Sequence, residues 1–316
     1  MTRAVLVAGG AGYIGSHVVR RLLVEGRDVV VLDDLSTTSH HRTTHHRLYV
    51  GDLFDPSLVG RIIAAHGIDT IIDAAASHHP SQRISSTATA LAGFLKAGVS
   101  KVIFTSSCAV YGPSRAGQPV DETCAQSPVS AHGGEKLALE QLLFSLSGTD
   151  GFRCVVIRCF NVVGAYRDEG FFGSTGDPSR LINTAIQVAA GRRTHVPVFG
   201  SDLPTRDGTC VRDYVHVDDV ARAFVNAVTY LDRGGRSVVL NCGSGLGHSV
   251  RDVLGAVEAE SGVIVPARFL PRRPGDVPFM VSNIRKIRET LDWCPRQDSL
   301  LAAVRTALKC ERIPSS

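Results

Sequence analysis

Short apolar runs alternate with helical patterns along the first half of the chain. The apolar runs cover residues 3–9, 28–34, 46–52, 69–76, 101–107 and 154–160, and helical spacing covers residues 12–26, 56–67, 87–98 and 132–147. Strands that alternate with helices of this length predict a parallel sheet with right-handed crossovers. The strands are apolar almost throughout, which is typical of a sheet that is covered on both faces.

The second half of the chain has a looser pattern. Residues 164–179 are glycine-rich and are expected to form a loop. Helical spacing returns at residues 181–193, 216–231, 249–262, 283–293 and 298–310, with one buried strand at residues 238–243. Trp293 is expected to pack in the core. We predict an α/β fold, in which a Rossmann doubly wound parallel sheet in residues 1–165 is followed by a smaller C-terminal lobe in residues 166–316.

Composition and charge narrow the class of protein. The chain has 316 residues, of which 44% are hydrophobic and 20% charged. No apolar run approaches the roughly 20 residues of a membrane span, and glycines interrupt the apolar N-terminus where a signal peptide would need a longer run. The net charge of +4 is not clustered, and no aromatic-basic stripe is present. We therefore expect a cytoplasmic protein that binds neither membrane nor nucleic acid.

The cysteines and clustered histidines do not form a recognisable metal site. The eight cysteines are scattered without a C-x-x-C pair, which favours buried reduced thiols over a disulfide or zinc site. His40, His41, His45 and His46 lie close together after the second predicted strand. Because no cysteine or carboxylate accompanies them at ligand spacing, we interpret this segment as a solvated loop and expect no metal.

Three glycines separate the first predicted strand from the first predicted helix. Gly9, Gly12 and Gly15 have the spacing G-x-x-G-x-x-G. One glycine permits a tight turn, one lets the backbone approach a pyrophosphate, and one allows the helix to pack closely on the strand. The phosphates would then lie at the helix N-terminus. Asp33, at the end of the next strand, is suited to bind a ribose 2′-hydroxyl, which favours NAD over NADP and disfavours a glycine turn without a ligand.

Several further segments carry a family resemblance. After the glycine motif come "SSCAVYG", "EKLALEQ", "RCFNVVGA", "GTCVRDYVHVDD", "LNCGSGLGHSV" and "PRRPGD". Together they resemble the extended short-chain dehydrogenases/reductases, most closely the UDP-glucose (UDP-galactose) 4-epimerase family. This resemblance implies NAD as cofactor, a UDP-sugar or related nucleotide sugar as substrate, and segments of the C-terminal lobe that return to the Rossmann sheet.

The resemblance also implies roles for individual residues. Ser107 falls on the serine that binds the sugar 4-hydroxyl, and Lys136 on the lysine that holds the nicotinamide ribose and lowers the pKa of the base. The implied cofactor contacts are Gly9, Gly12, Tyr13, Ile14, Gly15, Asp33, Asp52, Leu53, Ala75, His78 and Lys136. The implied substrate contacts are Ser107, Asn161, Arg212, Arg273 and Asp276. A surface salt bridge with Asp213 is the alternative for Arg212.

The chain departs from the family pattern at four places. His132 stands where the family has its catalytic tyrosine, and Cys159 stands where a tyrosine lines the nicotinamide. Arg180 and Asn183 replace an asparagine and a proline of the substrate segment. The stretch before Lys101 is shorter than in the family, and it normally carries most of a helix used in dimerisation. The resemblance therefore leaves both a homodimer and a monomer open.

The histidine at position 132 leaves three interpretations. Imidazole has an unperturbed pKa of about 6.5 and is suited to act as a general base, although it reaches less far than a tyrosine. In the first interpretation His132 or a water molecule is the base of an active enzyme. In the second the base comes from elsewhere, with His78, His79 and Tyr166 as candidates. In the third the protein is catalytically silent and binds NAD and a UDP-sugar.

The residues after Ser107 narrow the reaction type. Relatives that eliminate water or carbon dioxide carry acidic residues there, whereas this chain has Cys108 and Ala109. We interpret Cys108 as a packing residue, because nothing adjacent in sequence would activate its thiol. The pattern therefore favours epimerisation through a 4-keto intermediate, with another nucleotide-sugar oxidoreductase or modifying activity as the alternative.

Overall fold

The computed structural model describes residues 3–36, 47–75, 80–113, 117–168, 171–172, 180–273, 275–297 and 299–311. The predicted cofactor contact His78, the alternative base His79 and the histidines of the segment 40–46 lie outside the described residues. Within these ranges, no helix combines the length and the apolar character that a bilayer crossing requires.

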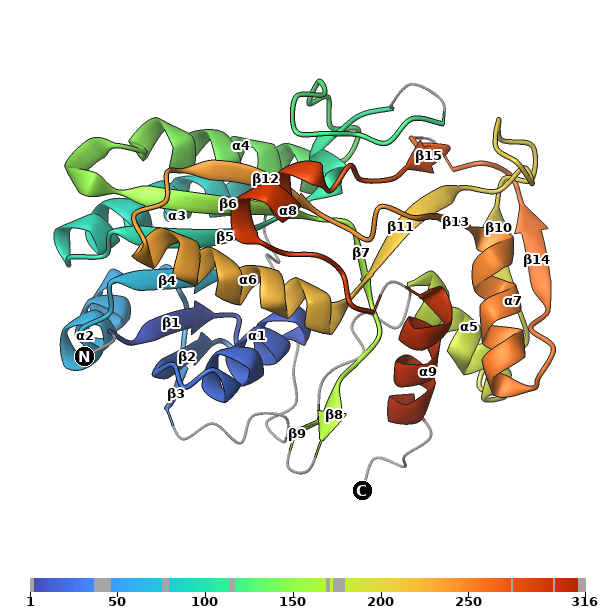
Figure 1. Ribbon diagram of the computed structural model, residues 1–316, viewed down its shortest axis with the longest axis horizontal. Coiled ribbons are helices and arrows are strands. Elements are labelled where there is room, and N and C mark those ends of the chain that lie inside the picture. Colours follow the sequence, from blue (N-terminus) through green and yellow to red (C-terminus); the bar gives the residue numbers. More distant parts are fainter. Residues whose placement is uncertain are drawn as a thin grey trace.

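A seven-stranded parallel sheet forms the centre of the N-terminal part (Figure 1). In spatial order its strands are β12 (Val238–Cys242), β6 (Arg153–Cys159), β5 (Lys101–Ser107), β4 (Thr70–Asp73), β1 (Val5–Ala8), β2 (Val29–Asp33) and β3 (Leu48–Val50). Every pair of neighbouring strands is parallel. The predicted Rossmann fold is confirmed, and β12, from the second half of the chain, forms one edge of the sheet.

Helices cover both faces of this sheet. One face carries α1 (Tyr13–Val24), α6 (Val217–Asp232) and α8 (Arg285–Leu291), and the other carries α2 (Pro56–His66), α3 (Pro80–Lys96) and α4 (Ala131–Leu146). Alternate residues of a strand point to opposite faces, so Val5 and Val7 pack with the first set of helices and Leu6 with the second. Two short 3-10 helices, η2 (Cys108–Val110) and η3 (Thr149–Gly151), follow β5 and α4.

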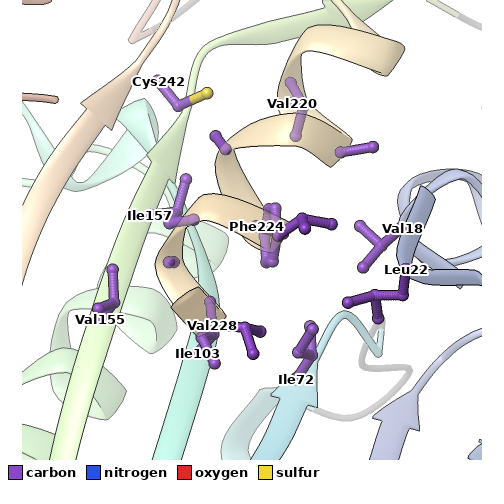
Figure 2. Packing of buried hydrophobic residues seen from close by; sticks show 14 of the residues in the cluster. Val18, Leu22, Ile72, Ile103, Val155, Ile157, Val220, Phe224, Val228 and Cys242 are labelled. Atoms are coloured by element: carbon purple, nitrogen blue, oxygen red, sulfur yellow. The ribbon is translucent and has the colours of Figure 1, made fainter. Parts of the chain in front are cut away.

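The core beneath α1 and α6 is closely packed. Figure 2 shows Leu22 of α1 and Phe224 of α6 meeting over Ile72, Ile103 and Ile157 of three adjacent strands, and all five side chains belong to one buried cluster. Full burial of an aliphatic or aromatic side chain contributes roughly 1.5–3 kcal/mol. Helix α6 therefore belongs to the Rossmann core, although it follows β6 by more than fifty residues of chain.

The C-terminal lobe is built around a separate cluster of buried side chains. Its helices are α5 (Leu181–Ala189), α7 (Val250–Ser261) and α9 (Leu300–Glu311), which pack with the parallel strands β10 (Val196–Phe199) and β14 (Ala267–Leu270). Figure 1 shows this lobe beside the carboxyl ends of the central strands.

A second small sheet joins the two parts of the molecule. Strand β11 (Val211–His216) pairs with β7 (Asn161–Val163), β13 (Gly247–Ser249) and β15 (Phe279–Met280). Strand β7 directly continues the chain from β6, so the chain leaves the central sheet at this point. It returns with α6 and β12, and then enters the C-terminal lobe again.

Four predictions from the sequence need correction. The segment 164–179 contains two short antiparallel strands, β8 (Arg167–Asp168) and β9 (Phe171–Phe172), whose two-residue length leaves no periodicity to detect. Helix α3 begins at Pro80 instead of near residue 87, with proline at the first helical position. It spans 17 residues, so the shortened segment before Lys101 still contains a substantial helix. All eight cysteines are free, but only Cys154, Cys159 and Cys242 are buried, and Cys294 is exposed.

The expectation for Trp293 is confirmed. Its side chain is 1% exposed, and its indole Nε1 donates a hydrogen bond to the carbonyl of Asp219 at 2.9 Å. This contact ties the segment after α8 to the first turn of α6.

Candidate active site

The glycine loop between β1 and α1 requires glycine at two positions. Gly9 has a φ of 71°, in the left-handed region, and a Cβ there would lie 2.6 Å from the Cα of Ala75. A Cβ on Gly15 would lie 2.0 Å from the carbonyl oxygen of Gly9. The close approach of α1 to the end of β1 leaves its first backbone N–H groups directed toward the end of the sheet, where they favour an anion.

Asp33 lies beside this loop at the end of β2. Its Oδ2 accepts a hydrogen bond from the backbone N–H of Ala11 at 2.8 Å, and its Oδ1 accepts one from Leu35 at 2.9 Å. The residue is 6% exposed. Each carboxylate oxygen has a second lone pair, so Asp33 is able to accept further hydrogen bonds from ribose hydroxyls. The loop and this acid together fit a dinucleotide such as NAD.

The other predicted cofactor contacts surround the same end of the sheet. Tyr13 and Ile14 open α1, and the hydroxyl of Tyr13 donates to the carbonyl of Gly164 at 2.7 Å. Ala75 follows β4 and faces Gly9. Asp52 is exposed just after β3, whereas Leu53 is 7% exposed and packs into the core. These contacts therefore lie along the carboxyl ends of the strands, except that Leu53 has a clear packing role.

Ser107 lies at the carboxyl end of β5, close to the start of α4. Its Oγ accepts a hydrogen bond from the N–H of Ala109 at 3.1 Å. The first turn of α4 packs directly on η2, because a Cβ on Gly133 would lie 2.1 Å from the carbonyl oxygen of Ala109. Glycine at position 133 therefore allows α4 to approach the segment that begins at Ser107.

Lys136 joins α4 to β5 inside the protein. Its Nζ donates to the carbonyl of Thr105 at 2.8 Å and lies 4.7 Å from the centre of the Phe104 ring. The side chain is largely buried, since the residue is 7% exposed. Thr105 precedes Ser107 by two residues in β5, so the ammonium group and the serine lie at the same end of the sheet.

His132 is the second residue of α4 and is exposed. It precedes Lys136 by one helical turn, so the two side chains share one side of the helix. The hydroxyl of Ser130 caps this helix by accepting a hydrogen bond from the N–H of Gly133 at 3.1 Å. The capped first turn packs on Ala109, two residues after Ser107, and His132 is exposed on this turn.

The predicted substrate contacts lie on the segments that join the lobes. Asn161 begins β7, and Arg212 lies on the neighbouring strand β11. Arg273 and Asp276 form an ion pair of 3.1 Å between Nε and Oδ2. The guanidinium group of Arg273 also lies 4.2 Å from the centre of the Phe199 ring in β10. Two arginines are thus available at the edge of the C-terminal lobe for an anionic ligand.

Asp213 does not form the alternative salt bridge with Arg212. The Asp213 side chain is 0% exposed and accepts hydrogen bonds from Ser244, Gly245 and Ser282. Arg212 instead donates from Nη1 to the carbonyl of Val211 at 3.0 Å. Adjacent residues of a strand point to opposite faces, which separates the two charges. The salt-bridge interpretation of Arg212 is therefore wrong, and Asp213 has a structural role.

The alternative base Tyr166 packs against α1. Its ring lies 3.4 Å from the guanidinium carbon of Arg20, and its backbone N–H donates to Nε2 of His17 at 3.1 Å. The stacking occupies one face of the ring. This arrangement gives Tyr166 a role in holding the lobes together and disfavours it as the base.

The thiols next to Ser107 are poor nucleophiles. Desolvation raises the pKa of the half-buried Cys108 thiol to about 11, and burial raises that of Cys159 to about 12. Both remain protonated at neutral pH, and the thiolate is the reactive form. This agrees with the interpretation of Cys108 as a packing residue, and it assigns Cys159, the Cα partner of Ser107, to the lining of the site.

A buried polar network lies behind the site, and the sequence analysis did not predict it. The guanidinium group of Arg158 in β6 pairs with Glu140 of α4 at 2.6 Å from Nη2 to Oε2, and Ser106 donates to the same carboxylate. Nη1 of Arg158 also donates to the hydroxyl of Tyr111 at 2.8 Å. An arginine within an apolar strand and a glutamate four residues after Lys136 were the available signals for this network.

Comparison with protein families identifies the chain. Residues 5–243 match the model of the NAD dependent epimerase/dehydratase family. The chain belongs to this family. The match covers the glycine loop, the Ser107–Lys136 region and strand β12 of this epimerase/dehydratase, and confirms the resemblance that its motifs indicated.

Individual relatives are similar over nearly the whole epimerase/dehydratase chain. A UDP-glucose 4-epimerase from Azospirillum brasilense is 40% identical over 320 residues, which cover 98% of this chain and 92% of that protein. A crystal structure of UDP-glucose 4-epimerase from Stenotrophomonas maltophila with bound NAD and formylated UDP-arabinopyranose has a TM-score of 0.91 and 37% identity, covering 98% of both chains. A Bifidobacterium longum UDP-glucose 4-epimerase, crystallised with NAD⁺ and UDP, has a TM-score of 0.87 and 31% identity, also covering 98% of both chains.

Proposed function

We propose that the protein is an NAD-dependent epimerase that inverts C4 of a UDP-hexose through a 4-keto intermediate. The observation that carries this proposal is the position of Ser107 and Lys136, which lie at the same end of the sheet as the glycine loop and Asp33. The three relatives described above share nearly the full length of the chain and are named UDP-glucose 4-epimerases. The absence of acids at Cys108 and Ala109 supports epimerisation over elimination.

We assign the two parts of the chain separate tasks. Residues 1–165, completed by α6 and β12, would hold the dinucleotide through the glycine loop and Asp33. Residues 166–316 contribute Arg212, Arg273 and Asp276 to the nucleotide part of the substrate. Bound NAD would supply the acceptor for the hydride that leaves C4 of the sugar and the donor that returns it to the opposite face.

The side chains of the chain handle the proton of the 4-hydroxyl. Ser107 holds this hydroxyl through its Oγ, and His132 accepts the proton directly or through one water molecule. The ammonium group of Lys136, which donates to the carbonyl of Thr105, would hold the nicotinamide ribose. After the keto sugar has turned over in the site, the imidazolium returns the proton to the oxygen at C4.

The proposal is tested with purified protein, NAD⁺ and UDP-galactose. We expect UDP-glucose to form, and we expect His132→Ala to lower kcat by roughly 10²- to 10⁴-fold, the usual contribution of a general base. Tyr166→Phe serves as the matched control, because it removes the hydroxyl of the alternative base and leaves the ring on Arg20; we expect it to retain activity.

Two results would favour the other interpretations. Loss of activity in Tyr166→Phe but not in His132→Ala would make the tyrosine the base. Absence of turnover in the wild type, with NAD binding intact in calorimetry, would favour a silent binding protein.

A further inference from the structure

Arg180 places an additional positive charge between the two lobes. It is the residue before α5, its side chain is exposed, and its Nη1 donates to the carbonyl of Val162 at 3.2 Å. Val162 belongs to β7, which continues the chain from Cys159, and Cys159 is the Cα partner of Ser107. The contact therefore attaches the guanidinium group to the segment that leads away from the catalytic end of the sheet.

The electrostatic influence of Arg180 agrees with this position. Burial raises the pKa of Tyr13 and of Cys159, and the positive charge of Arg180 partly opposes the rise in both. Coulomb interactions weaken with distance, so the guanidinium group lies near both side chains. Tyr13 opens α1 next to the glycine loop, whereas Cys159 ends β6 next to Ser107. The charge of Arg180 thus acts on a side chain at the start of α1 and on one at the end of β6.

Arg180 has no acidic partner among the described residues. Arg158 and Arg273 differ in this respect, because Arg158 pairs with Glu140 and Arg273 with Asp276, whereas Arg212 also donates only to a backbone carbonyl. A guanidinium group has five N–H donors, and the structure accounts for one of them, at Val162. Its planar fork matches a carboxylate or a phosphate with two parallel hydrogen bonds. Arg180 is therefore equipped to receive an anionic group of a ligand.

The positions of the substituents on a hexopyranose ring indicate which anionic group Arg180 would receive. The diphosphate is attached at C1, which lies across the ring from C4, and Arg212 and Arg273 supply two positive charges for it. C6 is attached to C5, the neighbour of C4. A cation near the catalytic corner, where C4 must lie, is therefore closer to a substituent at C6 than to the diphosphate.

We propose that Arg180 binds a carboxylate at C6 of the sugar, so that the preferred substrate is a UDP-hexuronate. This inference rests on the proposed function, because it takes the C4 position from it. The reaction is unchanged: the 4-hydroxyl is oxidised and reduced, and the carboxylate keeps its charge throughout. Arg180 acts as the specificity residue and takes no part in the proton transfer.

The test compares an acidic and a neutral sugar on the same protein. NAD-saturated enzyme is assayed in parallel with UDP-glucuronate and UDP-galactose, and the binding of UDP-glucuronate, UDP-glucose and UDP is measured by calorimetry. A hydrogen bond to a charged group contributes enough to change affinity by roughly 10- to 100-fold. We expect the wild type to prefer the hexuronate by a factor in this range, in both kcat/KM and affinity.

Arg180→Gln removes the charge while keeping a hydrogen-bonding side chain. We expect it to abolish most of this preference, because kcat/KM and affinity fall far more for the hexuronate than for the neutral sugar. Arg193→Gln is the matched control, because Arg193 is an exposed arginine beyond the other end of α5 that contacts Gln187. Thermal melting of each variant verifies that it is folded.

The outcomes separate this inference from the proposed function. Equal losses for both sugars in Arg180→Gln would mean that the arginine holds the diphosphate, and would overturn the inference. A wild type that favours the neutral sugar would also overturn it. If neither sugar is turned over but calorimetry still shows a hexuronate preference that depends on Arg180, the proposed epimerase function fails and the inference stands.

Discussion

At the scale of single residues, the ion pair buried behind the active site carries a large desolvation cost. Arg158 and Glu140 are 2% and 3% exposed, so both charges have lost their contact with water. Taking a charge out of water costs several kcal/mol, which good geometry and additional hydrogen bonds have to offset. Tyr111 and Ser106 supply those bonds. Because Glu140 follows Lys136 by one turn, the pair also fixes α4 on the strands that carry Ser107.

We predict that Glu140→Ala lowers the free energy of unfolding by about 3–5 kcal/mol, because the guanidinium group is left buried without a carboxylate. The measurement is equilibrium unfolding in urea. The double variant Glu140→Leu with Arg158→Met should lose much less, since neither charge then remains. Glu289→Ala removes an exposed ion pair with Arg285 and serves as the control, for which we expect a far smaller change. Equal losses in Glu140→Ala and in the control would contradict the argument.

At the scale of secondary-structure elements, glycines determine how closely helices approach the sheet. Gly15 lets α1 pack on the glycine loop, and Gly133 lets α4 pack on η2. In each case the added Cβ would collide with a backbone carbonyl oxygen, which has little freedom to move. The helix would have to shift as a whole, and the groups that it positions would shift with it.

We predict opposite effects for two glycine-to-alanine substitutions in helices. Gly15→Ala should destabilise the fold by roughly 1–3 kcal/mol, a usual cost of overpacking, and should abolish NAD binding in calorimetry. Gly60→Ala in α2 meets no heavy atom within 4 Å and should stabilise by about 0.5–1 kcal/mol, because alanine favours a helix. Retention of NAD binding in Gly15→Ala would show that the loop tolerates the displacement.

At the scale of the whole molecule, hydrogen bonds from α1 hold the lobes together. Tyr13 binds the carbonyl of Gly164, and His17 accepts from the N–H of Tyr166 through Nε2. His17 is 2% exposed, and its Nδ1 contacts the carbonyl of Tyr13 at 2.8 Å. Nε2 of His17 can accept from the N–H of Tyr166 only while that nitrogen carries no proton. The contact between the lobes therefore depends on a neutral His17 imidazole.

We predict that the stability of the protein falls in mild acid because of this histidine. Burial, with a smaller contribution from the nearby charges of His216 and Arg20, lowers the pKa of His17 from 6.5 to about 4. Between these values the unfolded chain binds the proton and the folded chain does not. The free energy of unfolding therefore decreases by about 1.4 kcal/mol for each pH unit as the pH falls through this window.

Urea unfolding of the wild type and His17→Gln from pH 7 to pH 4 measures this contribution. The variant lacks the titrating group. As the pH falls, its free energy of unfolding should therefore decrease less steeply than that of the wild type, by about 1.4 kcal/mol for each pH unit. His195→Gln, which replaces a histidine in the segment after α5, is the control and should keep the slope of the wild type. If the free energy of unfolding had the same pH dependence in the wild type and in His17→Gln, the prediction would be wrong.

The sequence predicted the parts of the fold that depend on local pattern. Runs such as residues 101–107 form strands, and the spacing of apolar residues in α1 and α6 forms helices, because the periods of 2 and 3.6 are set by the backbone itself. Strands β7, β10, β11, β13, β14 and β15 were missed. Strands β7, β13 and β15 have only two or three residues, which are too few to show a period. The start of α3 at Pro80 was missed because its first turns show no apolar pattern.

The sequence by itself determined which segments form the central strands, most of the covering helices and the glycine loop, because the local apolar pattern and the spacing of the glycines set them. Its motifs also carried the family resemblance around Ser107. Only the tertiary structure decided that Asp213 pairs with serines rather than Arg212, that Arg158 meets Glu140, and that Arg180 reaches Val162. Those partners are distant in sequence, and strand register, helix position and burial determine which of them meet. The fold, and not the local sequence, therefore decides which charged side chains remain without an acidic partner and are able to bind a ligand.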